Sequence, residues 1–286
     1  MSKFLKLNKK FALICVVLIA ACLLSGFTTA SGEHEVEYTE IPVYVDGILM
    51  FKGYKFEDTT YVSLRTFCTT LDKDLKIRWD QDSKTAFVEA DGLVLSAREG
   101  DNYITANGRY FYVPRGVLNY NGTILVPIRE VAKAFNVKVN WNNRYWTVDL
   151  DTSEMSFIES GDGFYNEEDL YWLSRIINAE SLNQLLEGKI AVGNVVLNRV
   201  ADESCPDTIY DVIFDNKYGV QFSVTTNGTI YMDPSEESII AAKICLEGYS
   251  VVGDSIYFVN PDIGVSSWFV NTRTFVKSIG DHDFYA

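Results

Sequence analysis

The sequence predicts a mixed α+β chain in which a small β-rich module precedes a mainly helical region. Two observations predict this order. Short β-like runs separated by turn dipeptides fill residues 41 to 150, whereas apolar residues recur at helical spacing from Asn166 onward. Residues 151 to 165 lie between them, are acidic and lack sustained periodicity, which is typical of a linker. We therefore expect one domain at 41–150 and another at 166–286.

The first thirty residues have the pattern of a secretory signal peptide. A basic segment with lysines at positions 3, 6, 9 and 10 precedes an apolar run from 11 to 24, and Thr28-Thr29-Ala30 supplies small residues for cleavage. The apolar run is shorter than the about 20 residues that a membrane span needs. Residues 19 to 22 loosely resemble a lipobox, but the two leucines that follow fit it poorly. We expect residues 1–30 to be removed and the protein to be secreted.

Composition excludes several classes of function. Residues 31 to 286 carry 21 basic and 39 acidic side chains, a net charge of −18. Such a surface repels nucleic acid and anionic lipid, so we expect neither as a partner. The chain has only two histidines, His34 and His282, and the cysteines of the mature chain match no zinc motif. No metal and no other cofactor is predicted, and nothing indicates the oligomeric state.

Three turn dipeptides define hairpins in the β-rich module. They are Asp46-Gly47, Asp91-Gly92 and Asn107-Gly108, each flanked by β-like runs. Residues of these types tolerate the positive φ angles that a two-residue hairpin turn demands.

The same module contains an internal repeat. Residues 59–71 (TTYVSLRTFCTTL) align with residues 122–135 (GTILVPIREVAKAF), and Val62 then coincides with Val126. Each copy predicts a strand, a short helix and a hairpin, and Pro127 suits the first turn of the second helix.

Each copy continues into a tryptophan, Trp79 or Trp141. Residues 41–150, above all LVPIREVAKAF…VNW, resemble the copper amine oxidase N-terminal domain. No histidine and only one cysteine lie in this range, so no copper site is indicated. The module is either a wall-binding or spacer unit or a scaffold whose Trp79 and Trp141 pack its core. Core packing is slightly favoured, because aromatic residues at strand ends are more often buried.

The helical region begins with a carboxyl group in an unusual position. Asn166 is a good N-cap, and apolar residues follow it at helical spacing: Leu170, Leu173 and Ile177. Glu180 is the next member of that series, so its carboxyl falls on the face otherwise reserved for burial. Burial raises a carboxyl pKa, and a protonated carboxyl is what a general acid needs. The alternative is a solvated glutamate, or one paired with Arg175 or Arg199.

Motifs spaced along residues 166–286 resemble the SleB-type cell wall hydrolase family. The stretch LSRIINAES precedes GKIAVGNVVLNRV, and QFS (221–223), YFVNP (257–261) and the terminal IGDHDFYA follow in order. The resemblance implies a lysozyme-like helical fold that cuts peptidoglycan glycan strands, with Glu180 as the catalytic residue. Residues 181–185 depart from the family pattern, which has glycine and proline there.

Other residues of this region have structural or binding interpretations. The helix at about 187–201 is apolar nearly all round and belongs in the middle of a domain. Gly193 permits close packing there, and a structural role is favoured for Asn194 and Asn198. A further helix is expected from Ser235 through Gly248.

Four residues are candidates for sugar binding, with ligand contact and structure equally supported: Gln221, Ser223, Tyr257 and Asn260. Phe222 points the other way if this stretch is extended. Trp268 is either a sugar platform or a core residue. His282 is interpreted as an interior hydrogen-bonding residue without a catalytic role.

The mechanism favoured by the residues is lytic transglycosylation. A glycosidase needs a second carboxylate, and Asp207, Asp211 and Asp215 are interpreted as ordinary turn or helix-surface residues. A lytic transglycosylase needs only Glu180, because a hydroxyl of the substrate attacks the anomeric carbon. The alternatives are simple hydrolysis of the same bond and a wall-binding protein without activity.

Two further expectations concern cysteines and domain independence. Cys205 and Cys245 either form a disulfide or remain free, with Cys245 a small buried hydrophobe. A cysteine peptidase using Cys205 and His282 has little support, because no helix N-terminus activates the thiol. A fragment beginning near Gly161 is expected to fold alone. Peptidoglycan is the expected partner, in the cell wall or the spore cortex.

Overall fold

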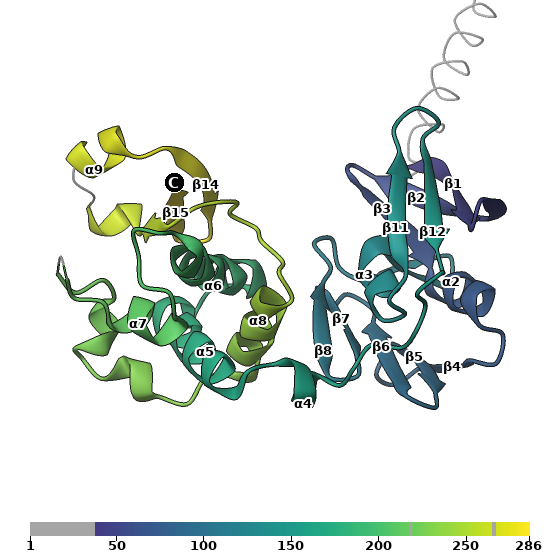
Figure 1. Ribbon diagram of the computed structural model, residues 1–286, viewed down its shortest axis with the longest axis horizontal. Coiled ribbons are helices and arrows are strands. Elements are labelled where there is room, and N and C mark those ends of the chain that lie inside the picture. Colours follow the sequence, from purple (N-terminus) through teal and green to yellow (C-terminus); the bar gives the residue numbers. More distant parts are fainter. Residues whose placement is uncertain (1–37, 218, 265–266) are drawn as a thin grey trace, which may run out of the picture. The chain divides into compact units, whose positions relative to one another are not determined.

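A computed structural model describes residues 38–217, 219–264 and 267–286 (Figure 1). Sheets dominate the first part of the described chain and helices the second, so the prediction of a mixed α+β fold is confirmed. The predicted signal peptide lies outside the described residues.

The first sheet has seven strands in the order β11-β12-β1-β2-β3-β10-β9. Neighbouring strands are antiparallel except β1 and β12, which run parallel with Val43 opposite Val148. The strands of this sheet are β1 (Thr39–Val45), β2 (Ile48–Phe56), β3 (Thr59–Ser63), β9 (Leu118–Tyr120), β10 (Thr123–Pro127), β11 (Lys138–Asn142) and β12 (Thr147–Asp151).

The second sheet is an antiparallel meander of five strands in sequence order. They are β4 (Lys76–Asp80), β5 (Thr85–Ala90), β6 (Leu93–Arg98), β7 (Tyr103–Ala106) and β8 (Arg109–Tyr112). All three predicted turn dipeptides join neighbouring strands, β1 to β2, β5 to β6 and β7 to β8. Asp46 and Asn107 take positive φ angles of 50° and 51°, as the turn chemistry requires.

The internal repeat is confirmed as two strand–helix–hairpin units. The first is β3, α2 (Leu64–Leu71), β4 and β5, and the second is β10, α3 (Ile128–Lys133), β11 and β12. β3 and β10 pair antiparallel with Val62 opposite Val126, so the two copies meet at equivalent residues. Pro127 is the last residue of β10 and precedes the first turn of α3, one position earlier than predicted.

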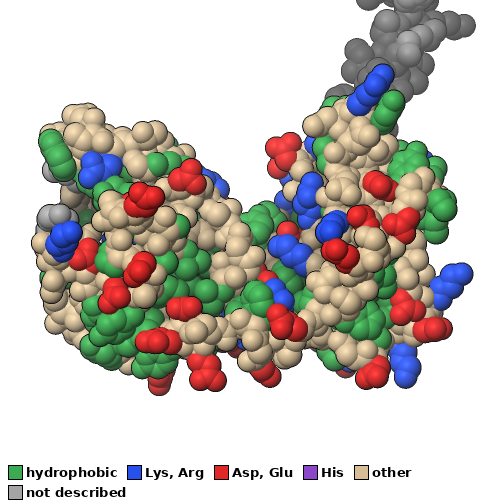
Figure 2. Space-filling model, in the orientation of Figure 1, with side chains coloured by type: hydrophobic (Ala, Val, Ile, Leu, Met, Phe, Trp, Pro, Cys, Tyr) green, Lys and Arg blue, Asp and Glu red, His purple; other side chains and the backbone are tan. Residues whose placement is uncertain are grey.

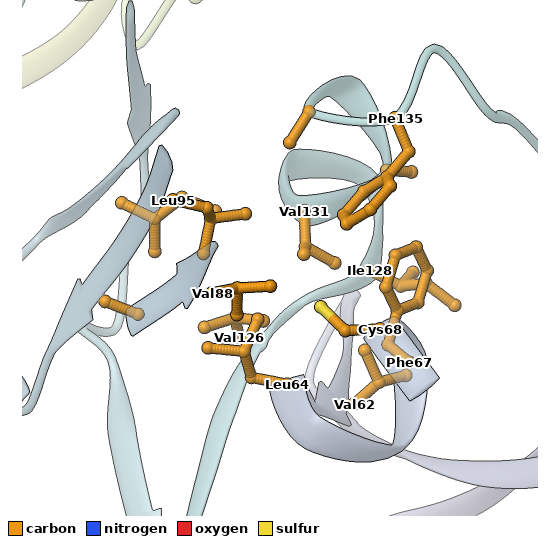
Figure 3. Close-up of a cluster of buried hydrophobic side chains, with 14 of the residues drawn as sticks. Val62, Leu64, Phe67, Cys68, Val88, Leu95, Val126, Ile128, Val131 and Phe135 are labelled. Atoms are coloured by element: carbon orange, nitrogen blue, oxygen red, sulfur yellow. The ribbon is translucent and has the colours of Figure 1, made fainter. Parts of the chain in front are cut away.

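The core of this module lies between the two helices and both sheets. Phe67 of α2 and Phe135, just after α3, have ring centroids 5.8 Å apart. Side chains from β3, β5, β6 and β10 point into the same cluster (Figure 3). Trp141 packs partly against this core, but Trp79 is 38% exposed and lies outside it. Core packing was therefore the wrong interpretation for Trp79.

The predicted linker packs against the module. Ile158 is buried in the module's core, and its N–H donates to the carbonyl of Ala134. The side chain of Asn107 donates to the Ile158 carbonyl at 2.8 Å. A short helix, α4 (Gly161–Phe164), precedes the helical region. Residues 151–165 are thus held by hydrogen bonds, and the domain boundaries at 150 and 166 stay a prediction.

The helical region surrounds a nearly fully buried central helix. α6 (Leu186–Ala201) packs against α5 (Glu167–Ser181) and α8 (Glu236–Leu246). Around them lie α7 (Ile209–Phe214), α9 (Ser267–Thr272), the 3₁₀ turns η1 (Ser223–Thr225), η2 (Thr229–Tyr231) and η3 (Pro261–Ile263), and a sheet ordered β13 (Tyr257–Val259), β15 (His282–Tyr285), β14 (Phe275–Ile279).

The predicted structural roles within α6 are confirmed. A Cβ atom at Gly193 would lie 2.6 Å from Cys245 Sγ and 2.8 Å from Ile177 Cδ1, so glycine permits the three helices to approach. Asn194 donates to the Tyr249 carbonyl and accepts from the Val251 N–H.

The surface of the described residues is mixed in charge. Asp and Glu side chains are spread over the face shown in Figure 2, with Lys and Arg between them. None of the helices in the described part of the chain is long and apolar enough to cross a membrane.

Candidate active site

Glu180 lies in the last turn of α5, whose start is fixed by Asn166. The side-chain oxygen of Asn166 accepts from the N–H groups of Glu168 and Asp169 at 2.9 and 3.0 Å. Leu173 and Ile177 are fully buried on one face of this helix. Glu180 follows on the same face and is partly buried. Loss of solvent raises the pKa of the Glu180 carboxyl above its ordinary value.

A buried lysine fixes the chain that follows Glu180. Lys189 of α6 is 1% exposed, and its Nζ donates to the carbonyls of Ser181, Leu182 and Gln184 at 2.8 Å each. The Ser181 carbonyl also accepts from the N–H of Gln184 at 2.9 Å, and Lys189 Nζ lies 3.5 Å from Glu237 Oε2. The ammonium group of Lys189 therefore fixes the backbone of residues 181–185, the stretch where the sequence departs from the family pattern.

Asn178, two residues before Glu180, ties α5 to α8. Its Oδ1 accepts from the N–H of Ser235 at 3.0 Å and from the hydroxyl of Ser238 at 3.2 Å. The Asn-Ala-Glu triplet thus places a buried packing contact, at Asn178, two residues before the partly buried carboxyl of Glu180. These hydrogen bonds hold the end of α5, which carries Glu180, against the start of α8.

Glu180 opens into a cavity of about 480 Å³ that contains three of the four predicted sugar-binding residues. Gln221, Ser223 and Asn260 line it together with Glu180, and Phe258 and Phe269 contribute apolar surface. The fourth, Tyr257, lines a neighbouring cavity of about 620 Å³ instead. Polar groups around an apolar-walled cavity are typical of small-ligand sites.

Among the described residues that line this cavity, Glu180 is the only acidic one. The aspartates considered from the sequence lie elsewhere. Asp211 accepts from the hydroxyl of Thr208 at the start of α7, and Asp215 accepts from the N–H of Lys217. Asp207 is an exposed loop residue.

Comparison with known proteins identifies both regions of the chain. Residues 183–285 match the Cell Wall Hydrolase family, and residues 44–150 match the Copper amine oxidase N-terminal domain. A spore cortex-lytic enzyme of Bacillus cereus is 33% identical over 120 residues, which are 42% of this chain and 45% of that relative. One of Oceanobacillus iheyensis is 31% identical over 42% of each chain. The C-terminal region is a cell wall hydrolase domain.

Solved structures with similar sequences exist for two relatives. The catalytic domain of the Bacillus cereus SleB protein is 33% identical, covers 43% of this chain and 92% of that one, and gives a TM-score of 0.39. The catalytic domain of the germination-specific lytic transglycosylase SleB from Bacillus anthracis is 32% identical. The match covers 45% of this chain and 100% of that one, with a TM-score of 0.39. The matched segment spans less than half the length of the spore cortex-lytic enzymes. Glu180 lies just before the family match at 183–285.

Arg199 is a residue of the hydrolase domain that sequence reasoning considered only as an ion-pair partner. Its Nε donates to the Ile256 carbonyl at 2.7 Å, and its Nη1 reaches Gln221 Oε1 at 3.4 Å. It lines both the Glu180 cavity and the neighbouring one. Burial lowers the pKa of the guanidinium, yet arginine keeps its charge at physiological pH. The cavity therefore contains one cation beside one titratable carboxyl.

His282 also lines the Glu180 cavity, which the sequence did not indicate. Its Nδ1 is buried and has no hydrogen-bond partner among the described atoms, so the predicted interior hydrogen bond is wrong for this nitrogen. Burial lowers the pKa of the imidazole, against a smaller opposing effect of Asp281. His282 is therefore neutral at pH 7 and places an uncharged ring edge-on to Phe258 at 5.1 Å.

The remaining sequence candidates fall into two groups. Phe222 is buried while Gln221 and Ser223 are exposed, as the alternation predicted. Trp268 is 65% exposed, which excludes a core role. Cys205 and Cys245 are free, and the predicted possibility of a disulfide is not realised. Cys245 is buried against the carbonyl of Ile190, and burial raises the pKa of its thiol.

Proposed function

We propose that this chain cleaves the glycan strands of peptidoglycan, with Glu180 as general acid. The supporting observation is a half-buried carboxyl with a raised pKa that opens into a cavity lined by Gln221, Ser223 and Asn260. A carboxyl with a raised pKa stays protonated closer to neutral pH and is able to donate to a glycosidic oxygen. The relatives with similar sequences are named spore cortex-lytic enzymes, which supports a wall polymer as substrate.

The proposed reaction is lytic transglycosylation. Glu180 donates its proton to the oxygen of the scissile bond, and the leaving sugar departs as an alcohol. The resulting carboxylate then removes the proton from the hydroxyl of the same substrate that attacks the anomeric carbon, which gives a 1,6-anhydro product. Glu180 is the sole acidic lining group among the described residues, and this route needs no second carboxylate.

The side chains around Glu180 have distinct proposed roles. Gln221, Ser223 and Asn260 offer donors and acceptors for hydroxyl and acetamido groups. Tyr257 lines the adjoining cavity that Arg199 and Gln221 also line, so it is proposed to contact a neighbouring sugar. Arg199 is proposed to hold the side chain of Gln221 in the cavity, since its Nη1 reaches Gln221 Oε1 at 3.4 Å.

We place the protein outside the cell, in the wall or the spore cortex. The signal-peptide pattern of residues 1–30 supports export. The names of the relatives support a cortex or wall location.

The decisive experiment is digestion of purified spore cortex and vegetative sacculi, with released fragments analysed by mass spectrometry. The unmodified chain is expected to release 1,6-anhydro fragments, and Glu180→Gln to release none, because the amide has no proton to donate. Glu168→Gln, an exposed glutamate in the first turn of the same helix, is the matched control and should retain activity.

Each other outcome excludes one part of the proposal. Reducing-end fragments without the anhydro form would establish hydrolysis instead of transglycosylation. Fragment release by Glu180→Gln at the unmodified rate would exclude Glu180 as the acid. No release from either substrate by the unmodified, folded chain would leave a wall-binding protein as the remaining interpretation.

A further inference from the structure

The tip of the β11–β12 hairpin exposes two neighbouring aromatic side chains. Tyr145 is 65% and Trp146 is 56% exposed. Trp146 has a φ of +54°, in the left-handed region that glycine and asparagine favour. A bulky residue is uncommon in this conformation.

The first repeat builds the same turn without aromatic residues. Lys84 occupies the position equivalent to Trp146 and has a φ of +52°. The turn is formed by Asp80, whose carboxylate accepts from the N–H groups of Asp82 and Ser83.

The second repeat reproduces each of these contacts. Asn142 accepts from the N–H groups of Arg144 and Tyr145 at the equivalent positions. The tryptophan that starts each turn also matches, since Trp79 donates to Gln81 and Trp141 to Asn143. The turn can therefore form without Tyr145 and Trp146, because Ser83 and Lys84 occupy the equivalent positions in the first repeat.

The two aromatic residues line two different cavities. Trp146 lines a cavity of about 520 Å³ together with Trp141, and the two rings meet edge to face at 6.1 Å. Tyr145 lines a second cavity of about 570 Å³, where Trp141 also contributes. Trp141 thus lies between the two cavities and joins them into one surface, which we call the hairpin platform (Tyr145, Trp146 and Trp141).

Polar groups border the hairpin platform on both sides. Asp58, Arg129 and Asn143 line the cavity of Trp146, and Asn140 and Asn142 line that of Tyr145. Exposed rings flanked by amide, carboxylate and guanidinium groups suit a ligand with apolar faces and a rim of hydroxyls. A sugar ring has this chemistry, because its axial C–H bonds form apolar faces and its hydroxyl and acetamido groups lie at the edge.

We propose that the hairpin platform is a second glycan-binding site, separate from the Glu180 cavity. Its ligand is the uncharged sugar backbone of β-1,4-linked N-acetylhexosamine strands. The choice of peptidoglycan as the source of these strands rests on the proposed function of the hydrolase domain. The net charge of −18 on residues 31 to 286 opposes an anionic polymer as the occupant. A second contact to the same polymer raises the local concentration of the hydrolase domain at its substrate.

The test measures binding without cleavage. The full chain carrying Glu180→Gln is sedimented with purified sacculi from which anionic wall polymers have been removed. In this background Tyr145→Ser and Trp146→Lys are combined, which installs the residues that the first repeat has in the same turn. Loss of both rings is expected to raise the apparent Kd by about tenfold or more. Thermal unfolding should remain unchanged, because the same turn accommodates these residues at 83 and 84.

The matched control is Trp79→Ala, which removes the exposed tryptophan at the equivalent place in the first repeat. It is expected to bind sacculi as the Glu180→Gln parent does. A soluble β-1,4-linked N-acetylglucosamine tetramer provides a second probe, and its addition should quench tryptophan fluorescence in the parent more than in Trp146→Lys.

Equal binding by the parent and the double variant would overturn the proposal, as would binding that requires the anionic wall polymers to be present. Neither result depends on catalysis. Failure of the proposed function would instead appear as an absence of released fragments from the chain with Glu180 intact, whatever the hairpin variants bind.

Discussion

Glu180 occupies a position in which its negative charge destabilises the fold. Burial raises its pKa in the folded state, so the folded protein binds the proton more tightly than the unfolded chain does. The stability linked to this proton is fully present below the unfolded pKa and is lost as pH rises through the folded pKa.

We therefore expect Glu180→Gln to have a higher melting temperature than the unmodified protein at pH 7 to 8. The difference should shrink toward zero as pH falls below about 4.3, the ordinary pKa of glutamate. Differential scanning calorimetry across this range measures it. Glu168→Gln, exposed on the same helix, should show no such trend. A difference that grew at low pH would contradict the assigned direction of the shift.

Lys189 stabilises the chain just beyond Glu180. Replacing it with methionine keeps the apolar stem but removes the Nζ donor to the carbonyls of Ser181, Leu182 and Gln184. It also removes the ion pair of Lys189 with Glu237 at 3.5 Å. We expect Lys189→Met to lower the free energy of unfolding by about 2–3 kcal/mol, measured by urea denaturation. Lys277→Met removes a half-exposed ion pair with Glu187 and should cost less than about 1 kcal/mol. Equal losses of unfolding free energy in the two variants would show that the buried contacts of Lys189 stabilise the fold no more than an exposed ion pair does.

At the scale of elements, the packing of three helices depends on Gly193. Alanine favours a helix over glycine by about 1 kcal/mol, but its Cβ would lie 2.6 Å from Cys245 Sγ. We expect Gly193→Ala to be net destabilising by about 1–3 kcal/mol in urea denaturation. Cys245→Ala removes the opposing sulfur, so the double variant should recover part of the loss relative to the sum of the single ones. Strict additivity would mean that α6 and α8 do not meet at this point.

Most elements could be predicted because their signals are local. The dipeptides at 46–47 and 107–108, the cap at Asn166 and the alternation around Phe222 each act within a few residues, and the structure agrees with each. Such signals depend on backbone preference and on burial of one face, which the sequence displays directly.

The errors and omissions concern contacts between residues far apart in sequence. Lys189 resembles a helix-surface lysine until the carbonyls after α5 are placed beside it. His282 enters the Glu180 cavity only because β15 lies next to β13 in the sheet. Trp79 has the sequence context of a core residue and pairs with the buried Ala86, but it lies on β4, an edge strand of its sheet, and is 38% exposed. In each case the environment of the side chain depends on elements that are distant in sequence, so no local sequence pattern could predict it.

At the scale of the whole described chain, contacts of β8 bear on the prediction that a fragment from Gly161 folds alone, which stays a prediction. Tyr112 of β8 is buried in the apolar cluster of the hydrolase domain, and its ring meets Tyr249 at 5.0 Å. Arg109, also of β8, donates through Nε and Nη2 to Glu247 at 2.8 and 2.6 Å. A fragment from Gly161 would lose these contacts and expose the surface that they cover.

The Arg109–Glu247 pair provides a test of this coupling. Its side chains are 14% and 4% exposed, and Tyr165 also donates to Glu247 at 2.7 Å. We expect Arg109→Ala to lower the free energy of unfolding by about 3–5 kcal/mol, because Glu247 keeps a largely buried charge without its partner. Arg78→Ala breaks an exposed pair with Glu89 and should cost less than about 1 kcal/mol. A similarly small loss for Arg109→Ala would indicate that the contact does not join the two regions.

The parallel pairing of β1 with β12 has a mechanical consequence. Tension applied to the two ends of the described chain would enter the module at Thr39 and leave it at Asp151, at opposite ends of two adjacent strands. Pulling would slide these strands past each other, so the hydrogen bonds between them would share the load at once. Strands peeled apart from one end would instead release their bonds singly, at lower force. Tension along the chain would therefore meet its greatest resistance in this module at the β1–β12 pair.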